Sequence, residues 1–326
     1  HVHTEYSLLD GACRIDRLFD HIKAMGQTAC AITDHGVMYG CVAFFDAARA
    51  AGIKPIIGCE VYVATRTRFD KVNRIDGNNH LILLCKNEIG YKNLIKMVSA
   101  GFTEGFYSKP RIDKDLLEQH HEGLICLSAC LAGEVPRAIT ADDMQKAVEA
   151  ILWHKKLFGD DYYLELQLHK ATVERANHEA YPMQLKVNEH LRRLAAKHGV
   201  RLVCTNDVHF VDEDNAEAHD RLICLSTGKD LDDPKRMLYS KQEWLKTTAE
   251  MAAIFGQTDP EAMSTTVDIC NQIECYSIDH APIMPNFEIP EEFGTEAEYR
   301  ARLTEKDLFD EFTRDENGNV VMSEEE

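Results

Sequence analysis

The sequence predicts an α/β fold in which a mainly parallel sheet or barrel is surrounded by helices. Short apolar runs of strand length alternate with segments of helical period over most of the 326 residues. Glycines follow several of the helical segments, where a helix commonly ends. A hydrophobic content of 44% is ordinary for a globular chain with a substantial core. The length admits one large domain or two modest ones.

The apolar runs predict six strands, at residues 29–33, 55–63, 80–85, 123–128, 162–168 and 202–206. The helical period predicts amphipathic helices at 15–25, 43–51, 91–100, 141–158 and 183–198. Their stop signals are Gly26, Gly52, Gly159 and Gly199. A seventh strand is expected to end at residues 1–3, so most of that strand lies outside the sequence.

The formal net charge of -19 is unusual for a protein whose partner would be a polyanion such as DNA. Residues 288–326 alone hold fourteen acidic and four basic side chains, so about half of the excess lies in this tail. Bound divalent cations would add positive charge where a phosphate binds, and the formal count omits them. The charge therefore does not exclude DNA as a partner.

The 11 cysteines include no C-x-x-C pair. They are typical of buried thiols in a reducing compartment rather than of a disulfide framework or a zinc ribbon. No apolar run approaches the roughly 18 residues that a membrane span needs. The first residues also lack the layout of a secretory signal. We therefore expect a cytoplasmic protein with no membrane partner.

Side chains that bind metals follow several of the predicted strands. The residues at these strand ends are His1, His3, His35, Cys130, Asp207 and His209. Residues two apart on an extended segment point to the same side, so each H-x-H or D-x-H pair can hold one ion. The carboxyl ends of parallel strands converge on one face of a barrel, where active sites lie. Glu60 and His80 lie within or at the beginning of strands, and the pattern does not fix their direction.

Imidazole and thiolate are ligands typical of zinc, whereas carboxylate and imidazole suit manganese. The set holds more donors than one four-coordinate ion takes, which favours a cluster of two or three divalent ions. Ions about 3.5–4 Å apart can activate water and clamp both oxygens of an in-line phosphoryl displacement.

Each residue also has a plain alternative. An H-x-H pair is often a surface or core feature, Asp34–His35 can be a capped turn, and Cys130 alone is more often a packed core thiol. Asp207 and His209 can likewise be an ordinary strand end. The joint pattern favours metal. The remaining histidines are expected on helix or loop surfaces: His120, His121, His154, His178, His190, His198 and His219.

Five ordered motifs resemble those of the PHP (polymerase and histidinol phosphatase) domain family. They are His1-Val-His-Thr-Glu-Tyr-Ser-Leu-Leu-Asp-Gly11, Ile32-Thr-Asp-His-Gly36, Lys54-Pro-Ile-Ile-Gly-Cys-Glu60, Leu127-Ser-Ala-Cys130 and Thr205-Asn-Asp-Val-His209. Two segments, 6–11 and 104–111, are similar to the branch found in bacterial DNA polymerase III alpha subunits rather than to histidinol phosphatases. The resemblance covers residues 2–274, and residues 281–308 resemble the segment that leads into the polymerase palm.

The resemblance implies nine ligands for three metals. One ion would be held by His1, His3, Glu60 and Asp207, a second by Asp10, His35 and His209, and a third by Glu60, as a bridge, with His80 and Cys130. It also implies a distorted seven-stranded (β/α)7 barrel over residues 1–276. Residues 277–326 would be an acidic linker and the start of the polymerase region. With most of its strand outside the sequence, His1 is expected to be held less firmly than the other ligands.

The resulting hypothesis is a metal-dependent phosphoesterase in DNA replication that acts as a 3'-5' proofreading exonuclease on a DNA end. Its nine ligands would use zinc, manganese or both, and its partners would be DNA, the rest of the polymerase and replisome subunits. The polymerase active site itself would lie outside this chain. Two alternatives stay open, a structural module that braces the polymerase and docks partners, and a free-standing phosphatase.

Two further groups of side chains have possible supporting roles. Cations near aromatic rings suit single-stranded DNA, and the candidates are Arg66, Arg68, Lys71, Arg74, Lys109 and Arg111. An ordinary solvated loop is an equal alternative for these cations. Glu165 and His169 are candidates to orient metal ligands, although such residues are more often the polar end of a strand.

Overall fold

The computed structural model describes residues 1–285, 294–304, 314–319 and 321. The chain divides into two compact units, His1–Ile278 and Asp279–Glu326. The strands are β1 (Ala29–Ile32), β2 (Lys54–Ala64), β3 (Asn78–Cys85), β4 (Arg111–Ile112), β5 (Leu124–Leu127), β6 (Tyr162–Leu166) and β7 (Arg201–Cys204). The helices are α1 (Ile15–Ala24), α2 (Cys41–Ala51), α3 (Glu88–Thr103), α4 (Lys114–His120), α5 (Glu134–Thr140), α6 (Met144–Phe158), α7 (Ala180–His198), α8 (Ala216–Thr227), α9 (Thr248–Phe255), α10 (Pro260–Gln272) and α11 (Glu296–Arg302).

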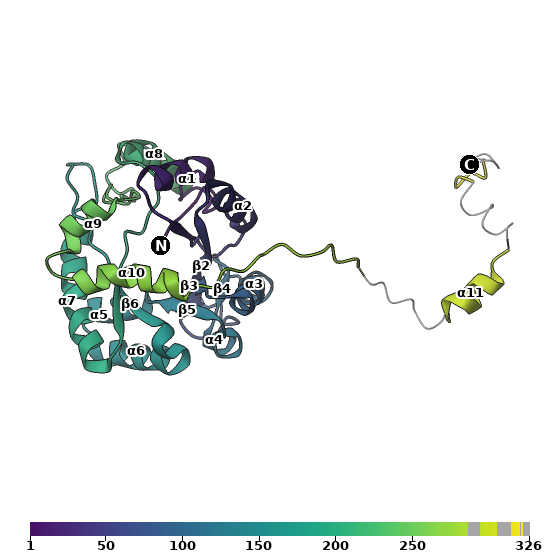
Figure 1. Cartoon of the computed structure of the whole chain (residues 1–326), viewed down its shortest axis with the longest axis horizontal. Coiled ribbons are helices and arrows are strands. Elements are labelled where there is room, and N and C mark those ends of the chain that lie inside the picture. The colour runs from purple at the N-terminus through teal and green to yellow at the C-terminus, as the bar shows by residue number, and fades with distance from the viewer. Residues whose placement is uncertain (286–293, 305–313, 320, 322–326) are drawn as a thin grey trace. The chain divides into compact units, whose positions relative to one another are not determined.

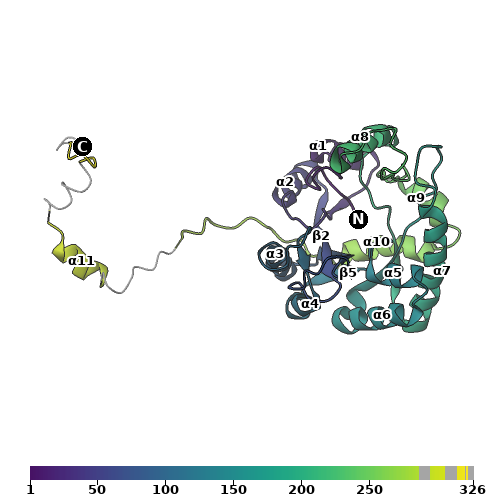
Figure 2. The same ribbon diagram turned by 180° about the vertical axis from the view of Figure 1, so that it is seen from behind.

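The strands of the first unit form one curled sheet in the order β1-β2-β3-β5-β6-β7, with β4 paired to β2. The sheet makes a half-barrel with helices around it (Figures 1 and 2). The mixed α/β barrel class is confirmed, and each predicted strand ends within two residues of an observed one. The mainly parallel pairing holds for β1–β2, β5–β6 and β6–β7. β3, by contrast, is antiparallel to both β2 and β5.

The first residues close the gap between the two ends of this sheet. Val2 bridges Val208 beyond β7, and the His3 amide donates to the Val208 carbonyl at 2.7 Å. On the other side the Thr33 amide, just beyond β1, donates to the Val2 carbonyl at 2.9 Å. The N-terminus accordingly lies inside the ring of elements in both views (Figures 1 and 2). Residues 1–3 therefore occupy the place predicted for the end of a seventh strand.

A cleft of about 820 Å³ lies between β1 and β7 and is flanked by α9 and α10. Apolar side chains such as Ile56, Val203 and Met251 line it, and His1 is its single lining residue among the nine candidate ligands. The candidate ligands therefore have to be located by their own contacts rather than by this cleft.

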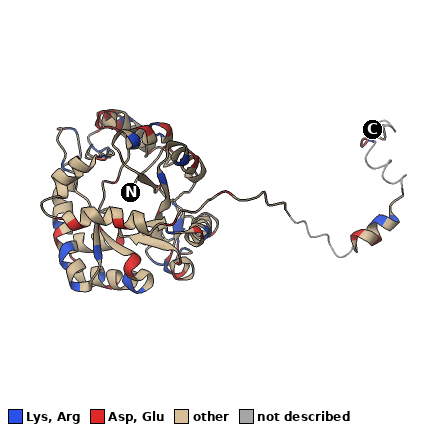
Figure 3. Ribbon diagram, viewed as in Figure 1, with Lys and Arg blue, Asp and Glu red and all other residues tan. Residues whose placement is uncertain are grey.

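The core forms because the central strands are buried on both faces and the helices on one. Every residue of β5 and β6 is buried, while α1 buries one apolar stripe that includes Leu18 and Ile22. Charged side chains of both signs lie on the surrounding helices (Figure 3). None of the described helices is long and apolar enough to cross a bilayer.

The second unit contains α11, which begins at a capping box between Thr295 and Glu298. A turn lies at Asn317–Gly318, where Gly318 has φ +83° and its amide donates to the Asp315 carbonyl. Part of the acidic tail predicted at 277–326, including Pro290, lies outside the described residues.

Candidate metal centre

The reversed direction of β3 brings His80 to the same edge as the ends of the parallel strands. His80 pairs with Tyr62 near the carboxyl end of β2. Since β3 runs antiparallel to β2, the beginning of β3 lies where β2 ends. Glu60 lies on the same part of β2, and its backbone forms a parallel β-bridge with that of His35. Two positions whose direction the sequence left open thus face the other candidate ligands.

Donor atoms of His1, His3, Glu60 and Asp207 form a first group, all within 4.8 Å of one another. His1 Nε2 lies 2.5 Å from Glu60 Oε2 and 3.1 Å from Asp207 Oδ1. His3 Nε2 lies 3.3 Å from Asp207 Oδ1. The His1 imidazole is fully buried, so this side chain is enclosed even though most of the strand expected to carry it lies outside the sequence.

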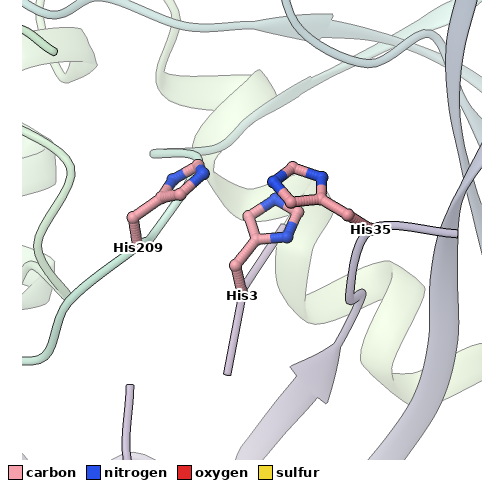
Figure 4. Close-up of side chains that lie close together, drawn as sticks. All are labelled: His3, His35 and His209. Carbon is pink, nitrogen blue, oxygen red and sulfur yellow. The ribbon is translucent and has the colours of Figure 1, made fainter. Parts of the chain in front are cut away.

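The imidazoles of His3, His35 and His209 form a second group (Figure 4). The His3 ring centroid lies 3.8 Å from that of His35 and 4.4 Å from that of His209. Asp10, expected as the third ligand here, lies beside the group, with Oδ2 2.9 Å from His35 Nε2. The structure therefore adds His3 to this group and keeps Asp10 within reach of it.

Glu60, His80 and Cys130 form a third group. Glu60 Oε1 lies 2.8 Å from His80 Nδ1, and Cys130 Sγ lies 3.7 Å from the same nitrogen. Glu60 is shared with the first group, as the resemblance implies for a bridge. The nine side chains named from the sequence are thus brought together.

Two of the donor separations have the size expected for ligands of one divalent ion, while the contacts of Glu60 with His1, His35 and His80 are shorter, at 2.5–2.8 Å. Two ligands at about 2.1 Å from one tetrahedral ion lie roughly 3.4 Å apart, and somewhat farther when one is sulfur. The separations between His3 and Asp207 and between His80 and Cys130 are of this size. His3 Nε2 and Asp207 Oδ1 are also buried without a hydrogen bond despite being 3.3 Å apart. Buried polar atoms are normally satisfied, and a shared cation satisfies both.

Protonation in the metal-free centre is governed by burial and by neighbouring charges. Burial disfavours the charged form of Glu60, but His80 and His35 outweigh it and hold the Glu60 pKa well below its usual range. Burial also disfavours the charged form of His35, yet Glu60 and Asp10 raise its pKa to about 10. Burial raises the pKa of the Cys130 thiol well above its usual value. Metal binding must therefore displace protons from this centre.

Left-handed backbone is found at or next to three of the candidate ligands. Leu9, which precedes Asp10, has φ +61°. Ala129, which precedes Cys130, has φ +64°, and Asp207 has φ +46°. These values lie in the left-handed region that residues other than glycine seldom adopt. Such conformations are concentrated at functional sites.

Glu165, named from the sequence as an orienting residue, contacts a candidate ligand. Its Oε1 lies 2.9 Å from His1 Nδ1, which leaves Nε2 of the same ring facing Glu60 and Asp207. His169 was named with it, but its Nε2 contacts the Asn206 carbonyl at 3.1 Å. Glu165 is thus the one of the pair that contacts the group.

Sequence reasoning missed Tyr239. Its hydroxyl donates to Asp10 Oδ1 at 2.9 Å and lies 3.3 Å from His209 Nε2. Tyr239 stands in a loop thirty residues beyond His209, and no motif pointed to it.

Asp34 does more than cap a turn, which was the plain alternative considered for it from the sequence. It is 1% exposed, and it accepts from the Thr4 amide at 2.7 Å and from the Ser7 hydroxyl at 2.6 Å. It therefore fixes the loop that carries Asp10. Its position directly before His35 was the available signal.

Two histidines expected on the surface are buried, which corrects those predictions. His154 is 2% exposed and stacks on Tyr162, and His219 is 1% exposed, with Nε2 2.9 Å from the Asp10 carbonyl. Each imidazole lies on the inner face of its helix. A single histidine at a buried position does not interrupt the helical spacing of the apolar residues around it.

The basic residues named as DNA contacts differ in their accessibility. Arg111 is 1% exposed and its guanidinium donates to backbone carbonyls, including that of Asp70 at 2.7 Å. Arg66 is paired with Asp76, and Arg68 with Glu104 and Asp113. The exposed cations of the set are Arg66, Lys71, Arg74 and Lys109. Arg111 is therefore a loop anchor rather than a surface cation.

The class of protein is thus an α/β half-barrel with histidines, carboxylates and a thiol gathered at its strand ends, where they could hold cations. Residues 1–169 match the PHP domain, and the chain belongs to this family.

Curated relatives extend the similarity beyond the matched domain. The chain is 43% identical over 308 residues to DNA polymerase III subunit alpha of Borreliella burgdorferi, covering 93% of this chain and 26% of that protein. It is 40% identical over 329 residues to the same subunit of Treponema pallidum, covering 100% of this chain and 27% of that protein. The chain thus spans about a quarter of the length of these relatives.

Among solved structures, an amidohydrolase from Chromobacterium violaceum matches with a TM-score of 0.38 and 15% identity, over 66% of this chain and 88% of that one. A similarity of this size supports no conclusion about function.

Proposed function

We propose that this chain is the PHP portion of a DNA polymerase III alpha subunit and hydrolyses phosphodiester bonds with two or three divalent ions. The observation that carries the proposal is the convergence of eight of the nine candidate ligands into three groups, linked through His3 and Glu60, with Asp10 beside one group at 2.9 Å from His35 Nε2. Zinc, manganese or both suit this mixture of imidazole, carboxylate and thiolate.

In this proposal some side chains of the centre hold the cations, and one side of the centre stays open to the substrate. Glu60 belongs to two donor groups and would be shared by two ions, and Glu165 fixes the ring of His1. When bound, divalent ions lower the pKa of water and neutralise charge on a phosphate. The side chains of Asp10 and His80 are 27% and 21% exposed, so one side of the centre faces solvent. A closed structural metal site would lack such an opening.

We infer that the substrate is the 3' end of DNA, which would make the activity a proofreading 3'-5' exonuclease. This step rests on the relatives, which are subunits of a DNA polymerase. The replisome partners and a cytoplasmic location follow from the same inference. A structural module remains the competing reading, and the solvent-open side of the centre favours hydrolysis over it.

The test pairs metal analysis with hydrolysis assays on the purified chain. Two to three ions per chain are expected, together with shortening of a labelled primer that carries a mismatched 3' end. Asp207→Asn should abolish cleavage, whereas Asp212→Asn, an exposed carboxylate beyond β7, should not. A metal content near zero after titration with zinc and manganese would refute the centre. Hydrolysis of phosphomonoesters alone would identify a phosphatase instead.

A further inference from the structure

Three exposed aromatic rings lie in a row on the first unit. Tyr39, Phe102 and Phe106 are 57%, 37% and 49% exposed. The ring centroids of Tyr39 and Phe102 are 6.2 Å apart, as are those of Phe102 and Phe106, and the latter two rings are stacked. Large rings this exposed and this close together are uncommon unless a partner covers them.

The row lies beside the metal centre rather than at a distant face. Tyr39 follows the candidate ligand His35 by four residues. Phe102 lies at the end of α3, the helix that follows the reversed strand β3 and so returns toward the edge where β3 begins. Chain segments far apart in the sequence therefore bring these rings to the rim of the centre.

Lys109 connects the row to the centre. Its Nζ lies 5.3 Å from the Tyr62 ring centroid, and the Tyr62 ring lies 5.2 Å from that of His80 and 6.5 Å from that of His35. A Cβ at Gly36 would lie 2.7 Å from the Tyr62 ring and 3.0 Å from Pro110, so the loop of Lys109 packs on the loop of His35. The exposed Lys109 is thus separated from His35 and His80 by one ring, that of Tyr62.

The loop that carries Phe106 and Lys109 is held in place. The Tyr107 amide donates to the Lys109 carbonyl in a tight turn whose middle residue, Ser108, has φ +61°. The buried guanidinium of Arg111 donates to the Gly105 carbonyl at 3.1 Å. A preorganised loop loses little conformational freedom when a ligand binds.

We propose that Tyr39, Phe102, Phe106 and Lys109, here called the aromatic ridge, bind a single-stranded DNA segment that leads into the metal centre. Ring faces stack on bases of any sequence, and a lysine beside them contacts the phosphate backbone. Lys109 supplies positive charge that an apolar protein segment would not require, and cations held by the donor groups would add to it. The choice of DNA rests on the proposed function.

The binding test uses the purified chain and a fluorescent oligothymidylate with cleavage-resistant phosphorothioate linkages. Phe102→Leu should weaken binding roughly tenfold, since it keeps apolar bulk and removes the ring. Phe102→Tyr should keep wild-type affinity, as should Leu152→Ala, an exposed apolar residue on α6. Lys109→Gln should lower the slope of log affinity against log salt by about 0.7.

A second oligonucleotide of the same length with abasic sites separates stacking from phosphate contacts. It should bind the wild-type chain more weakly, and Phe102→Leu should not weaken it further. Equal affinity for both oligonucleotides, or no effect of Phe102→Leu, would overturn the ridge. Loss of association with the rest of the polymerase in Phe102→Leu, with DNA affinity unchanged, would assign the rings to a protein contact and overturn it as well.

Cleavage assays test the aromatic ridge and the proposed hydrolysis separately. Ring-dependent binding without any phosphodiester cleavage would refute the exonuclease and leave the ridge intact. Cleavage at equal rates on normal and abasic 3' ends would support hydrolysis and overturn the ridge.

Discussion

Glu60 Oε1 lies 2.8 Å from His80 Nδ1 although the two residues belong to neighbouring strands of opposite direction. The register pairs His80 with Tyr62, so Glu60 and His80 are diagonal neighbours on one face of the sheet. The same carboxylate oxygen lies 2.8 Å from His35 Nδ1. Glu60 therefore joins side chains from three parts of the chain.

Glu60→Gln should lower metal occupancy more than Asp10→Asn. Glu60 belongs to two of the three donor groups, whereas Asp10 borders one of them through His35. An amide in place of the bridging carboxylate removes the charge that two cations share. Elemental analysis of both variants after identical dialysis measures the difference. Equal losses, or a larger loss in Asp10→Asn, would contradict the bridging role.

Tyr239→Phe should weaken the affinity for one ion by about tenfold and leave the fold intact. Its hydroxyl holds Asp10 and lies beside His209, and removing a residue that orients a metal ligand typically costs about 10- to 100-fold in affinity or activity. Competition titration with a chromophoric chelator reads out the change. Tyr181→Phe, on α7, is the control, and unchanged affinity in Tyr239→Phe would show that Asp10 needs no such support.

Cys130→Ser should lower zinc affinity more than manganese affinity. Cys130 is the one sulfur among the nine candidate ligands, and the substitution replaces a soft thiolate donor, which zinc favours more than manganese does, by a hard hydroxyl. Cys126→Ser is the matched control, because Cys126 is a buried thiol on β5 outside the donor groups. The control should lose stability by burying a poorly satisfied hydroxyl and keep its metals. The same outcome in Cys130→Ser would identify a packed thiol at this position.

The order and approximate ends of the strands were predictable because a buried strand reads as a short apolar run. The direction of β3 was not predictable, because the largely apolar run from His80 to Cys85 has the same pattern whichever way the strand runs. Helix α6 begins after residue 141, where the prediction began, because Asp143 caps it by accepting from the Lys146 amide. Short helices such as α4 and α5 hold seven residues each, too few for a period to show.

The proximity of the side chains at the strand ends was predictable because the carboxyl ends of parallel strands meet at one edge, whereas Asp10, Glu60 and His80 were assigned through the family motifs. Supporting residues were harder to predict. Tyr239 approaches Asp10 only through the path of a long loop, and Phe102 approaches Tyr39 only because α3 returns beside the site. Such proximity depends on tertiary packing, which no local pattern in the sequence records.

His154 should make the metal-free chain less stable as the pH falls below 6.5. Burial lowers its pKa from 6.5 to about 4, so between these values the unfolded chain binds a proton that the folded chain does not. The free energy of unfolding therefore rises with pH across this window. At 1.36 kcal/mol per unit, the loss at pH 5 is about 2 kcal/mol.

Urea unfolding at pH 7 and pH 5, in the presence of a chelator, measures this loss. His154→Phe fills the same space beside Tyr162 and cannot titrate, so its stability should fall by about 2 kcal/mol less than that of the wild type between the two pH values. His219 is also buried with a lowered pKa, and it contributes equally to both chains and cancels in the comparison. The exposed His178 provides the control variant, His178→Phe, which should follow the wild type. An identical pH response in His154→Phe and the wild type would show that His154 is protonated in the folded chain at pH 5.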